Sequence, residues 1–191
     1  MLILASQSPR RAELLRNAGI SFETCPADVD ESVREGEDSL VYVKRLAKEK
    51  ALATLATAPP GSVVLGADTT VVIDGESLGK PVDEDDARLM LERLGGRVHQ
   101  VMTGVCVAWR NANGGVVTEV DVETTEVEFA VLSKEDIAEY VATGEPMDKA
   151  GAYAIQGRAS RWIPRVDGCY FNVVGLPVAR VCIMLARAGK E

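Results

Sequence analysis

The sequence is poor in histidine and sparing with cysteine. His99 is the only histidine in 191 residues. This argues against a zinc site of histidine and cysteine, and a histidine-based catalytic triad would depend on that one residue. The four cysteines, Cys25, Cys106, Cys169 and Cys182, are widely spaced without a CxxC pair. They indicate buried thiols in a reducing compartment rather than a disulfide framework.

Long apolar runs are also missing, since none approaches the roughly 18 residues of a membrane span. The N-terminus, MLILASQSPRR, places its positive charges after a short apolar run, which is the reverse of a secretory signal. We therefore expect residues 2–5 to form the first strand of a cytoplasmic protein with no membrane partner.

The net charge is −8, from 21 basic and 29 acidic residues, and this argues against nonspecific binding to nucleic acid. It is compatible with a small phosphorylated ligand, because local charge can oppose the total. In an acidic protein such a ligand commonly needs a divalent cation between carboxylate and phosphate.

Hydrophobic patterning predicts alternating helices and strands in a single domain, 1–191, with one or two lobes. The expected helices cover about 9–18, 38–56, 83–94, 133–143 and 176–189. The expected strands cover 2–5, a short stretch after residue 20, apolar runs on either side of Asp68, and 98–109 and 116–132. This order predicts an α/β fold of the mixed α+β type, rather than a doubly wound parallel sheet.

Local signals mark several element ends. Ser8 is expected to cap the first helix, with Pro9 at its first position. Ser133, with Asp136 three residues later, is expected to cap another helix. The pair Asp74-Gly75 predicts a tight turn.

Two segments depart from simple patterning. The apolar parity of the strand 116–132 changes between Val122 and Val127. This change predicts a bulge near 124–125, or a strand that moves to another sheet surface. The segment 144–177 is long, glycine-rich and irregular, and its aromatic residues argue against disorder, so we expect it to line a site.

Arg10 and Arg11 follow Pro9 in the first turn of a helix, where the helix dipole favours negative charge. They either form a solvated face or bind an anion at the helix start. Lys50 poses a similar choice, because it shares the apolar stripe of the helix 38–56. It either snorkels at the edge of that stripe or faces a cleft and an anionic ligand.

Asp68 interrupts the nearly continuous apolar run VVLGADTTVV. It either forms an Asx turn between two strands or serves as a metal ligand or general base. Lys80, in LGKP, is expected on a rigid loop because Pro81 stops regular structure. Glu31, Asp148 and Lys149 are weak signals when taken singly.

Familiar phosphate and hydrolase motifs are absent: the sequence has no GxxxxGK[ST], GxGxxG, GxSxG or HExxH. The remaining cations and carboxylates are distributed along the chain. They suit a phosphate-handling site in which a metal bridges carboxylate and phosphate.

Seven strings occur in a characteristic order between Leu4 and Pro177: LASQSPRRAELL, KEKA, LGADTTVV, LGKP, HQVMTGV, GEPMDKAGAYAIQG and NVVGLP. Together they resemble the Maf family of nucleoside triphosphate pyrophosphatases. The resemblance implies a fold similar to inosine triphosphate pyrophosphatases, with an elongated mixed sheet, flanking helices and two lobes around a cleft. It implies hydrolysis between the α and β phosphates with Mg²⁺ or Mn²⁺, and a possible homodimer.

The resemblance also implies residue roles. The family's SxxR start matches Ser8 and Arg11, with Arg10 between them, and its site lysines match Lys50 and Lys80. These residues are expected to bind the phosphates. Among the acids, Asp68 matches the proposed general base and Glu31 the loop acid, and both are expected to hold the metal. Asp148 either completes the metal shell or pairs with Lys149, which otherwise contributes to substrate binding.

Three positions match those tied to base choice in the family: Arg11, Thr69 and Gln156. The strings ADT and IQG are typical of the dTTP/UTP branch, whereas the 7-methyl-GTP branch carries SDQ at the first. Gln156 offers a donor and an acceptor that suit the edge of a pyrimidine. The alternatives are a 7-methyl-GTP pyrophosphatase and a noncatalytic nucleotide-binding regulator of septum formation or cell division.

Overall fold

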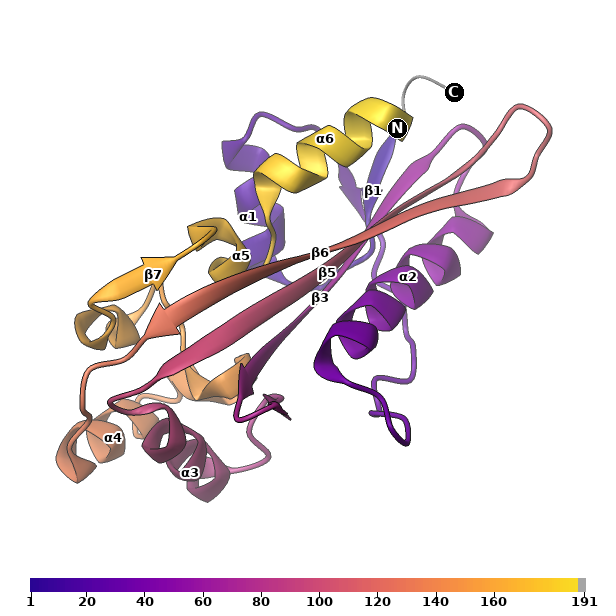
Figure 1. The fold of residues 1–191 in the computed structure, drawn as a ribbon. Helices are drawn as coiled ribbons and strands as arrows, with labels where there is room; N and C mark the ends of the chain where they lie inside the picture. Colours follow the sequence, from indigo (N-terminus) through magenta and orange to yellow (C-terminus); the bar gives the residue numbers. More distant parts are fainter. Residues whose placement is uncertain (189–191) are drawn as a thin grey trace. The chain divides into compact units, whose positions relative to one another are not determined.

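The computed structural model describes residues 1–188, which form a mixed sheet flanked by helices (Figure 1). In chain order the main elements are β1 (Leu2–Leu4), α1 (Pro9–Asn17), β2 (Glu23–Thr24), α2 (Ser39–Thr57), β3 (Val63–Ile73), β4 (Glu76–Leu78), α3 (Glu84–Leu94), β5 (Val98–Arg110), β6 (Val116–Glu128), α4 (Lys134–Val141), β7 (Arg165–Asp167), α5 (Tyr170–Val174) and α6 (Val178–Ala188). Three short 3₁₀ helices lie between α4 and β7, at Glu145–Asp148, Ala150–Ala152 and Arg158–Trp162.

The sheet has seven strands in the order β2-β1-β3-β5-β6-β7, with β4 paired to β3. β1 runs parallel to β2 and β3, whereas β4 is antiparallel to β3 and β7 is antiparallel to β6. The predicted mixed α/β class is therefore confirmed. The predicted end of the last helix near Gly189 lies outside the described residues.

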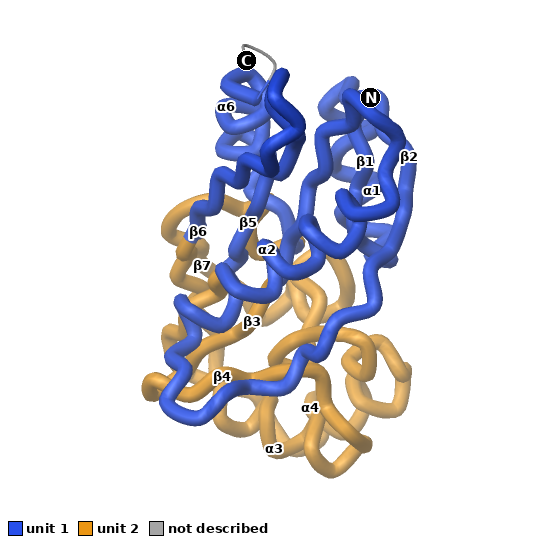
Figure 2. The backbone as a smooth tube through the Cα atoms, turned by 90° about the vertical axis from the view of Figure 1, so that its right-hand side faces the viewer, with its two compact units in different colours: residues 1–68, 103–123, 175–191 blue, residues 69–102, 124–174 orange. Residues whose placement is uncertain are grey.

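The chain divides into two compact units (Figure 2). Unit 1 comprises Met1–Asp68, Thr103–Glu123 and the chain from Gly175 onward, and unit 2 comprises Thr69–Met102 and Thr124–Val174. Strands β3, β5 and β6 each contribute residues to both units. The assignment of 1–191 to a single domain stays a prediction.

Both predicted caps occupy their expected positions, Ser133 before α4 and Ser8 before α1 with Pro9 in its first turn, but only Ser133 makes the side-chain hydrogen bond. Ser133 and Asp136 form a complete capping box at the start of α4. Ser8 occupies the cap position of α1, but its side chain makes no cap hydrogen bond. Instead its backbone N–H donates to the hydroxyl of Ser6 at 3.2 Å. Ser6, two residues earlier, therefore holds the backbone just before the helix.

Strand β3 runs unbroken through Asp68, so the predicted interruption and the Asx turn are wrong. The turn at Asp74-Gly75 is confirmed, since both residues have positive φ, 55° and 80°, and β3 and β4 pair across it. Two positive φ values are what a tight hairpin turn of this hand requires.

β5 and β6 are joined by a loop that satisfies its own backbone. The side-chain oxygen of Asn111 accepts from the N–H of Asn113 at 3.1 Å and from that of Gly115 at 2.9 Å. β6 is continuous through Thr125, and its side chains change from half-buried to alternately buried where the strand passes from unit 1 to unit 2. Because the first half of the strand shows no alternation of burial, the change of parity and the bulge both stay predictions.

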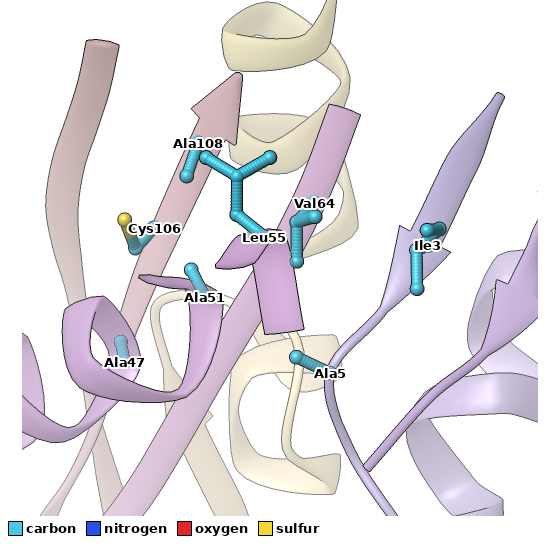
Figure 3. Close-up of a cluster of buried hydrophobic side chains, with 8 residues drawn as sticks. All are labelled: Ile3, Ala5, Ala47, Ala51, Leu55, Val64, Cys106 and Ala108. Atoms are coloured by element: carbon cyan, nitrogen blue, oxygen red, sulfur yellow. The ribbon is translucent and has the colours of Figure 1, made fainter. Parts of the chain in front are cut away.

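Unit 1 has a core in which α2 lies directly on the sheet (Figure 3). Its members are small and aliphatic: Ile3, Ala5, Ala47, Ala51, Leu55, Val64, Cys106 and Ala108. Two glycines allow this approach. A Cβ built on Gly66 would lie 2.2 Å from the carbonyl oxygen of Ala47, and one on Gly104 would lie 2.2 Å from that of Val43. Any side chain at these positions would push helix and sheet apart.

The irregular segment is ordered, as its aromatic content predicts, and contains the 3₁₀ helices, β7 and α5. All four cysteines are free thiols, but only Cys106 is buried, so the prediction of buried thiols is wrong for the others. Cys25 follows the edge strand β2 and Cys182 lies on α6, and both side chains are exposed. Among the described residues, no helix is both long and apolar enough to cross a membrane.

His99 belongs to the core of unit 2. Its Nε2 lies 2.8 Å from the hydroxyl of Tyr153, and its ring packs edge-on against Tyr153 and Phe129. Burial lowers the pKa of His99 to about 4. His99 is therefore neutral at pH 7 and has a structural role in this core.

This pKa predicts a dependence of stability on pH. The unfolded chain binds a proton at His99 near pH 6.5, whereas the folded chain does so only near pH 4. The contribution of neutral His99 is thus fully present above pH 6.5 and is lost as the pH falls from 6.5 to 4. Urea unfolding measures the free energy of unfolding at several pH values. Between pH 6.5 and 4 this free energy should fall less in His99→Gln than in the wild type. An equal fall of the unfolding free energy with pH in both proteins would contradict the assignment of His99 as a buried neutral side chain.

Candidate functional site

Lys50, Asp68 and Glu31 form a charged cluster in unit 1. The Lys50 ammonium lies 2.7 Å from Oδ1 of Asp68 and 2.6 Å from Oε1 of Glu31. The side chains of Lys50 and Asp68 are only 10% and 13% exposed, while that of Glu31 is 53% exposed. One nearly buried cation therefore joins a carboxylate on β3 to a carboxylate on a loop that water reaches.

The placement of Lys50 follows from its helix. Val43, Ala47 and Ala51 bury the face of α2 that rests on the sheet, and Lys50 lies at the edge of that face. The snorkelling alternative is wrong, because the ammonium is held beside two carboxylates instead of extending into water. Burial of both charges is tolerated because each has a partner of opposite sign.

Arg11 is buried at the first turn of α1 and is 9% exposed. Its Nε donates to the carbonyl of Gly175 at 2.8 Å, and its NH1 donates to the carbonyl of Ala67 at 2.9 Å and to the hydroxyl of Ser6 at 3.1 Å. Burial lowers its pKa, and the negative charges of Asp68 and Glu31 oppose that effect. Arg11 therefore connects three parts of unit 1 beside the cluster. The solvated-face alternative is wrong for Arg11, whereas Arg10 is half-buried.

Two residues that sequence reasoning missed hold the loop of Glu31. The hydroxyl of Tyr42 donates to the Glu31 carbonyl at 3.0 Å. Arg45 donates to both oxygens of Glu37, at 2.5 and 2.6 Å, and to the carbonyl of Ser32 at 2.9 Å. A signal for both was available, since Tyr42, Arg45 and Glu49 recur at three- and four-residue spacing on the helix that carries Lys50.

The pKa values of Tyr42 and Glu37 are shifted by the charged groups around them. Burial, with the negative charges of Asp68 and Glu31, raises the pKa of Tyr42 to about 12. The hydrogen bonds from Arg45 lower the pKa of Glu37 to about 2. At neutral pH Tyr42 is therefore a neutral donor, and Glu37 is a carboxylate that fixes Arg45.

Most of the other predicted site residues belong to unit 2, and Ser8 belongs to unit 1. Thr69 is the next residue of β3 after Asp68, and Lys80 is exposed on the loop after β4, as predicted. Lys149 forms an ion pair with Asp148, which is one of the two alternatives expected for Asp148. Gln156 is exposed in a turn before the last 3₁₀ helix. Ser8 is half-buried in unit 1 before α1.

The cluster has the donor chemistry of a divalent-cation site. Glu31 and Asp68 present carboxylate oxygens to one point, which the Lys50 ammonium occupies. Within residues 1–188, no three His, Cys, Asp or Glu side chains converge in a way that could hold a metal ion. Mg²⁺ is commonly held by one or two carboxylates, with substrate phosphates and water as its other ligands. Glu31 and Asp68 fit that pattern. Among the described residues, Asp148 does not join them in a group of three carboxylates.

The cluster predicts a stability effect for Lys50→Met. The variant leaves two carboxylates without their shared cation, one of them nearly buried. We expect the free energy of unfolding to fall by about 2 kcal/mol, since water still reaches Glu31 and limits the loss. Urea unfolding measures this change. Lys48→Met, on the exposed side of α2, is the control and should lose far less; equal losses would contradict the ion-pair argument.

Comparison with known proteins gives matches along nearly the whole chain. A family model described as Maf-like protein matches residues 1–188. A dTTP/UTP pyrophosphatase of Koribacter versatilis (strain Ellin345) is 54% identical over 188 residues, covering 98% of this chain and 94% of that protein. A dTTP/UTP pyrophosphatase of Anaeromyxobacter sp. (strain Fw109-5) is 53% identical, covering 98% and 89%. Among solved structures, the Staphylococcus aureus Ham1 protein has a TM-score of 0.48 at 16% identity, covering 68% and 71%.

Proposed function

Because this chain belongs to the Maf-like protein family, we propose that it is a nucleoside triphosphate pyrophosphatase that hydrolyses dTTP and UTP. The products are the nucleoside monophosphate and pyrophosphate. The observation that carries the proposal is the identity of 54% over 98% of the chain to a protein named for this activity. The cluster of Lys50, Asp68 and Glu31 supports it, because it supplies the acid, base and cation chemistry that the reaction needs.

Asp68 is the proposed general base. It takes a proton from the attacking water, the water oxygen bonds to the α phosphorus, and the bond between that phosphorus and the bridging oxygen breaks to release pyrophosphate. A carboxylate fixed by Lys50 at 2.7 Å has a defined direction, which positions the water that it deprotonates.

The cations neutralise the phosphates. Lys50 and Lys80 are proposed to bind the β and γ phosphates, and Ser8, Arg10, Arg11 and Lys149 to complete the phosphate contacts. Arg11 already bonds to three protein oxygens, so we assign its role to holding the start of α1 toward the anion as much as to direct contact. Thr69 and Gln156 are the proposed base-selecting residues.

A divalent cation, Mg²⁺ or Mn²⁺, would supply charge neutralisation and polarisation of the α phosphate when held by Glu31 and Asp68. Glu31 and Asp68 would hold this cation, and Lys50, which contacts both carboxylates at 2.6 and 2.7 Å, keeps their oxygens close together. Asp148 stays a proposed further ligand. A cytoplasmic location and a homodimer also belong to this proposal.

The test is pyrophosphate release from dTTP, UTP, CTP, GTP, ATP and 7-methyl-GTP, with Mg²⁺ and with EDTA. Release from dTTP and UTP that EDTA abolishes is the expected result. Preference for 7-methyl-GTP would overturn the assignment of the branch. Nucleotide binding without any release would favour the noncatalytic regulator instead.

A further inference from the structure

Gln156 lies at the corner of a tight turn in unit 2. The N–H of Gly157 donates to the carbonyl of Ala154 at 2.9 Å and closes the turn. Ile155, inside it, is 7% exposed and anchors the turn in the core, while Gln156 is exposed. The backbone of this turn therefore sets the direction in which the Gln156 side chain leaves the chain.

Two hydrogen bonds hold the turn from either side of Gln156. The N–H of Ala154 donates to the hydroxyl of Tyr140 at 3.1 Å. The N–H of Arg158 donates to the Glu145 carboxylate, at 3.0 Å to Oε1 and 3.3 Å to Oε2. The Tyr140 hydroxyl in turn donates to Oε1 of Glu145 at 2.8 Å. One continuous hydrogen-bonded chain thus spans the turn.

The Glu145 carboxylate lies directly against Gly157. A Cβ built on Gly157 would be 2.0 Å from Oε1 and 2.5 Å from Cδ of Glu145. The φ of Gly157 is −101°, which any residue adopts. Glycine at this position therefore serves the approach of the carboxylate and not an unusual backbone conformation.

Glu145 and Tyr140 are themselves held. Tyr140 is 1% exposed, and its ring packs edge-on against Trp162 with centroids 5.4 Å apart. The N–H of Glu145 donates to the hydroxyl of Thr143 at 3.2 Å, and Lys149 donates to its carbonyl at 3.3 Å. A carboxylate with a fixed backbone and a charge-assisted bond to an amide is a rigid support.

We propose that Glu145 and Tyr140 are positioning residues for base selection, fixing the turn that presents Gln156 to the nucleobase. This inference rests on the proposed function, since it concerns how that same site distinguishes thymine or uracil from cytosine. An amide side chain discriminates a base edge only if its donor and acceptor are held in place. Glu145 and Tyr140 supply the backbone part of that constraint, because they hold the amides of Ala154 and Arg158 on either side of Gln156.

The experiment compares Glu145→Gln, Tyr140→Phe and Gly157→Ala with the wild type. The control is Glu139→Gln, an exposed glutamate on α4. The readouts are kcat/KM for dTTP and CTP, from pyrophosphate release, and the exchange rates of the Ala154 and Arg158 amides by NMR. We expect each of the first three variants to lower the dTTP:CTP ratio about fivefold and to speed amide exchange about tenfold, with Glu139→Gln unchanged.

A double variant separates positioning from a general structural defect. In a Gln156→Ala background, Glu145→Gln should leave the dTTP:CTP ratio within about twofold, because its effect passes through Gln156. An undiminished effect in that background, or an unchanged ratio despite faster exchange, would overturn this inference alone. Failure of the wild type to hydrolyse dTTP or UTP would overturn the proposed function. The amide exchange rates need no substrate, so they would still report whether Glu145 holds the turn.

Discussion

Asp68→Asn should lower kcat for dTTP hydrolysis about a thousandfold and leave nucleotide binding nearly unchanged. Asparagine keeps the shape and can still accept the hydrogen bond from Lys50, which is 2.7 Å from Oδ1. It cannot take a proton from water at neutral pH, so the general-base contribution, commonly 10²–10⁴-fold, is lost. Pyrophosphate release under saturating substrate measures kcat, and calorimetric titration with dTTP measures binding.

Asp28→Asn, on the exposed loop that precedes the cluster, is the control and should retain its rate. A thermal unfolding curve shows whether Asp68→Asn is folded, which we expect because Lys50 keeps Glu31 as its ionic partner at 2.6 Å. A turnover within about tenfold of the wild type would remove Asp68 from the role of base and favour a metal-bound hydroxide formed without it.

Gly66→Ala should cost about 3 kcal/mol of unfolding free energy and most of the activity. The new methyl group would lie 2.2 Å from the Ala47 carbonyl and 2.8 Å from the Ala51 backbone nitrogen. These are backbone atoms, so α2 must move as a whole, and overpacking of this kind costs about 1–3 kcal/mol or more. Because α2 carries Lys50 and β3 carries Asp68, the same movement lengthens their 2.7 Å contact.

Gly79→Ala is the matched control, because a Cβ there meets nothing within 4 Å. Denaturant unfolding compares the two variants with the wild type, and kcat for dTTP compares activity in the fraction that is folded. If Gly66→Ala were as stable as Gly79→Ala, the close approach of α2 to β3 would not be a determinant of the fold.

Local signals in the sequence predicted the parts of the fold whose causes are local. The capping box of Ser133 and Asp136 and the turn at Asp74-Gly75 depend on residues a few positions apart, and both are confirmed. Ser8 occupies the cap position without a side-chain cap bond, and its own N–H donates to the hydroxyl of Ser6. Arg11 donates to the same Ser6 hydroxyl, a contact that spacing alone does not reveal.

The interruption predicted at Asp68 failed for a different physical reason. A lone carboxylate in an apolar run predicts a break, but its charge is compensated by Lys50, 18 positions away in sequence. Such a partner is invisible to any local window. Lys50, Asp68 and Glu31 could therefore be singled out from the sequence pattern and the family resemblance. Their convergence, and the support from Tyr42 and Arg45, required the structure.

The Asn111 loop bears on the order in which the chain folds. It closes β5 onto β6 over a few residues and satisfies its own backbone, so this hairpin needs little loss of chain entropy to form. The parallel pairing of Leu2 with Val63 must instead close a loop that contains α1 and α2. Contacts of that range form slowly. We expect pulsed hydrogen exchange during refolding to protect the amides of β5 and β6 before those of β1, and the reverse order would show that the sheet is nucleated elsewhere.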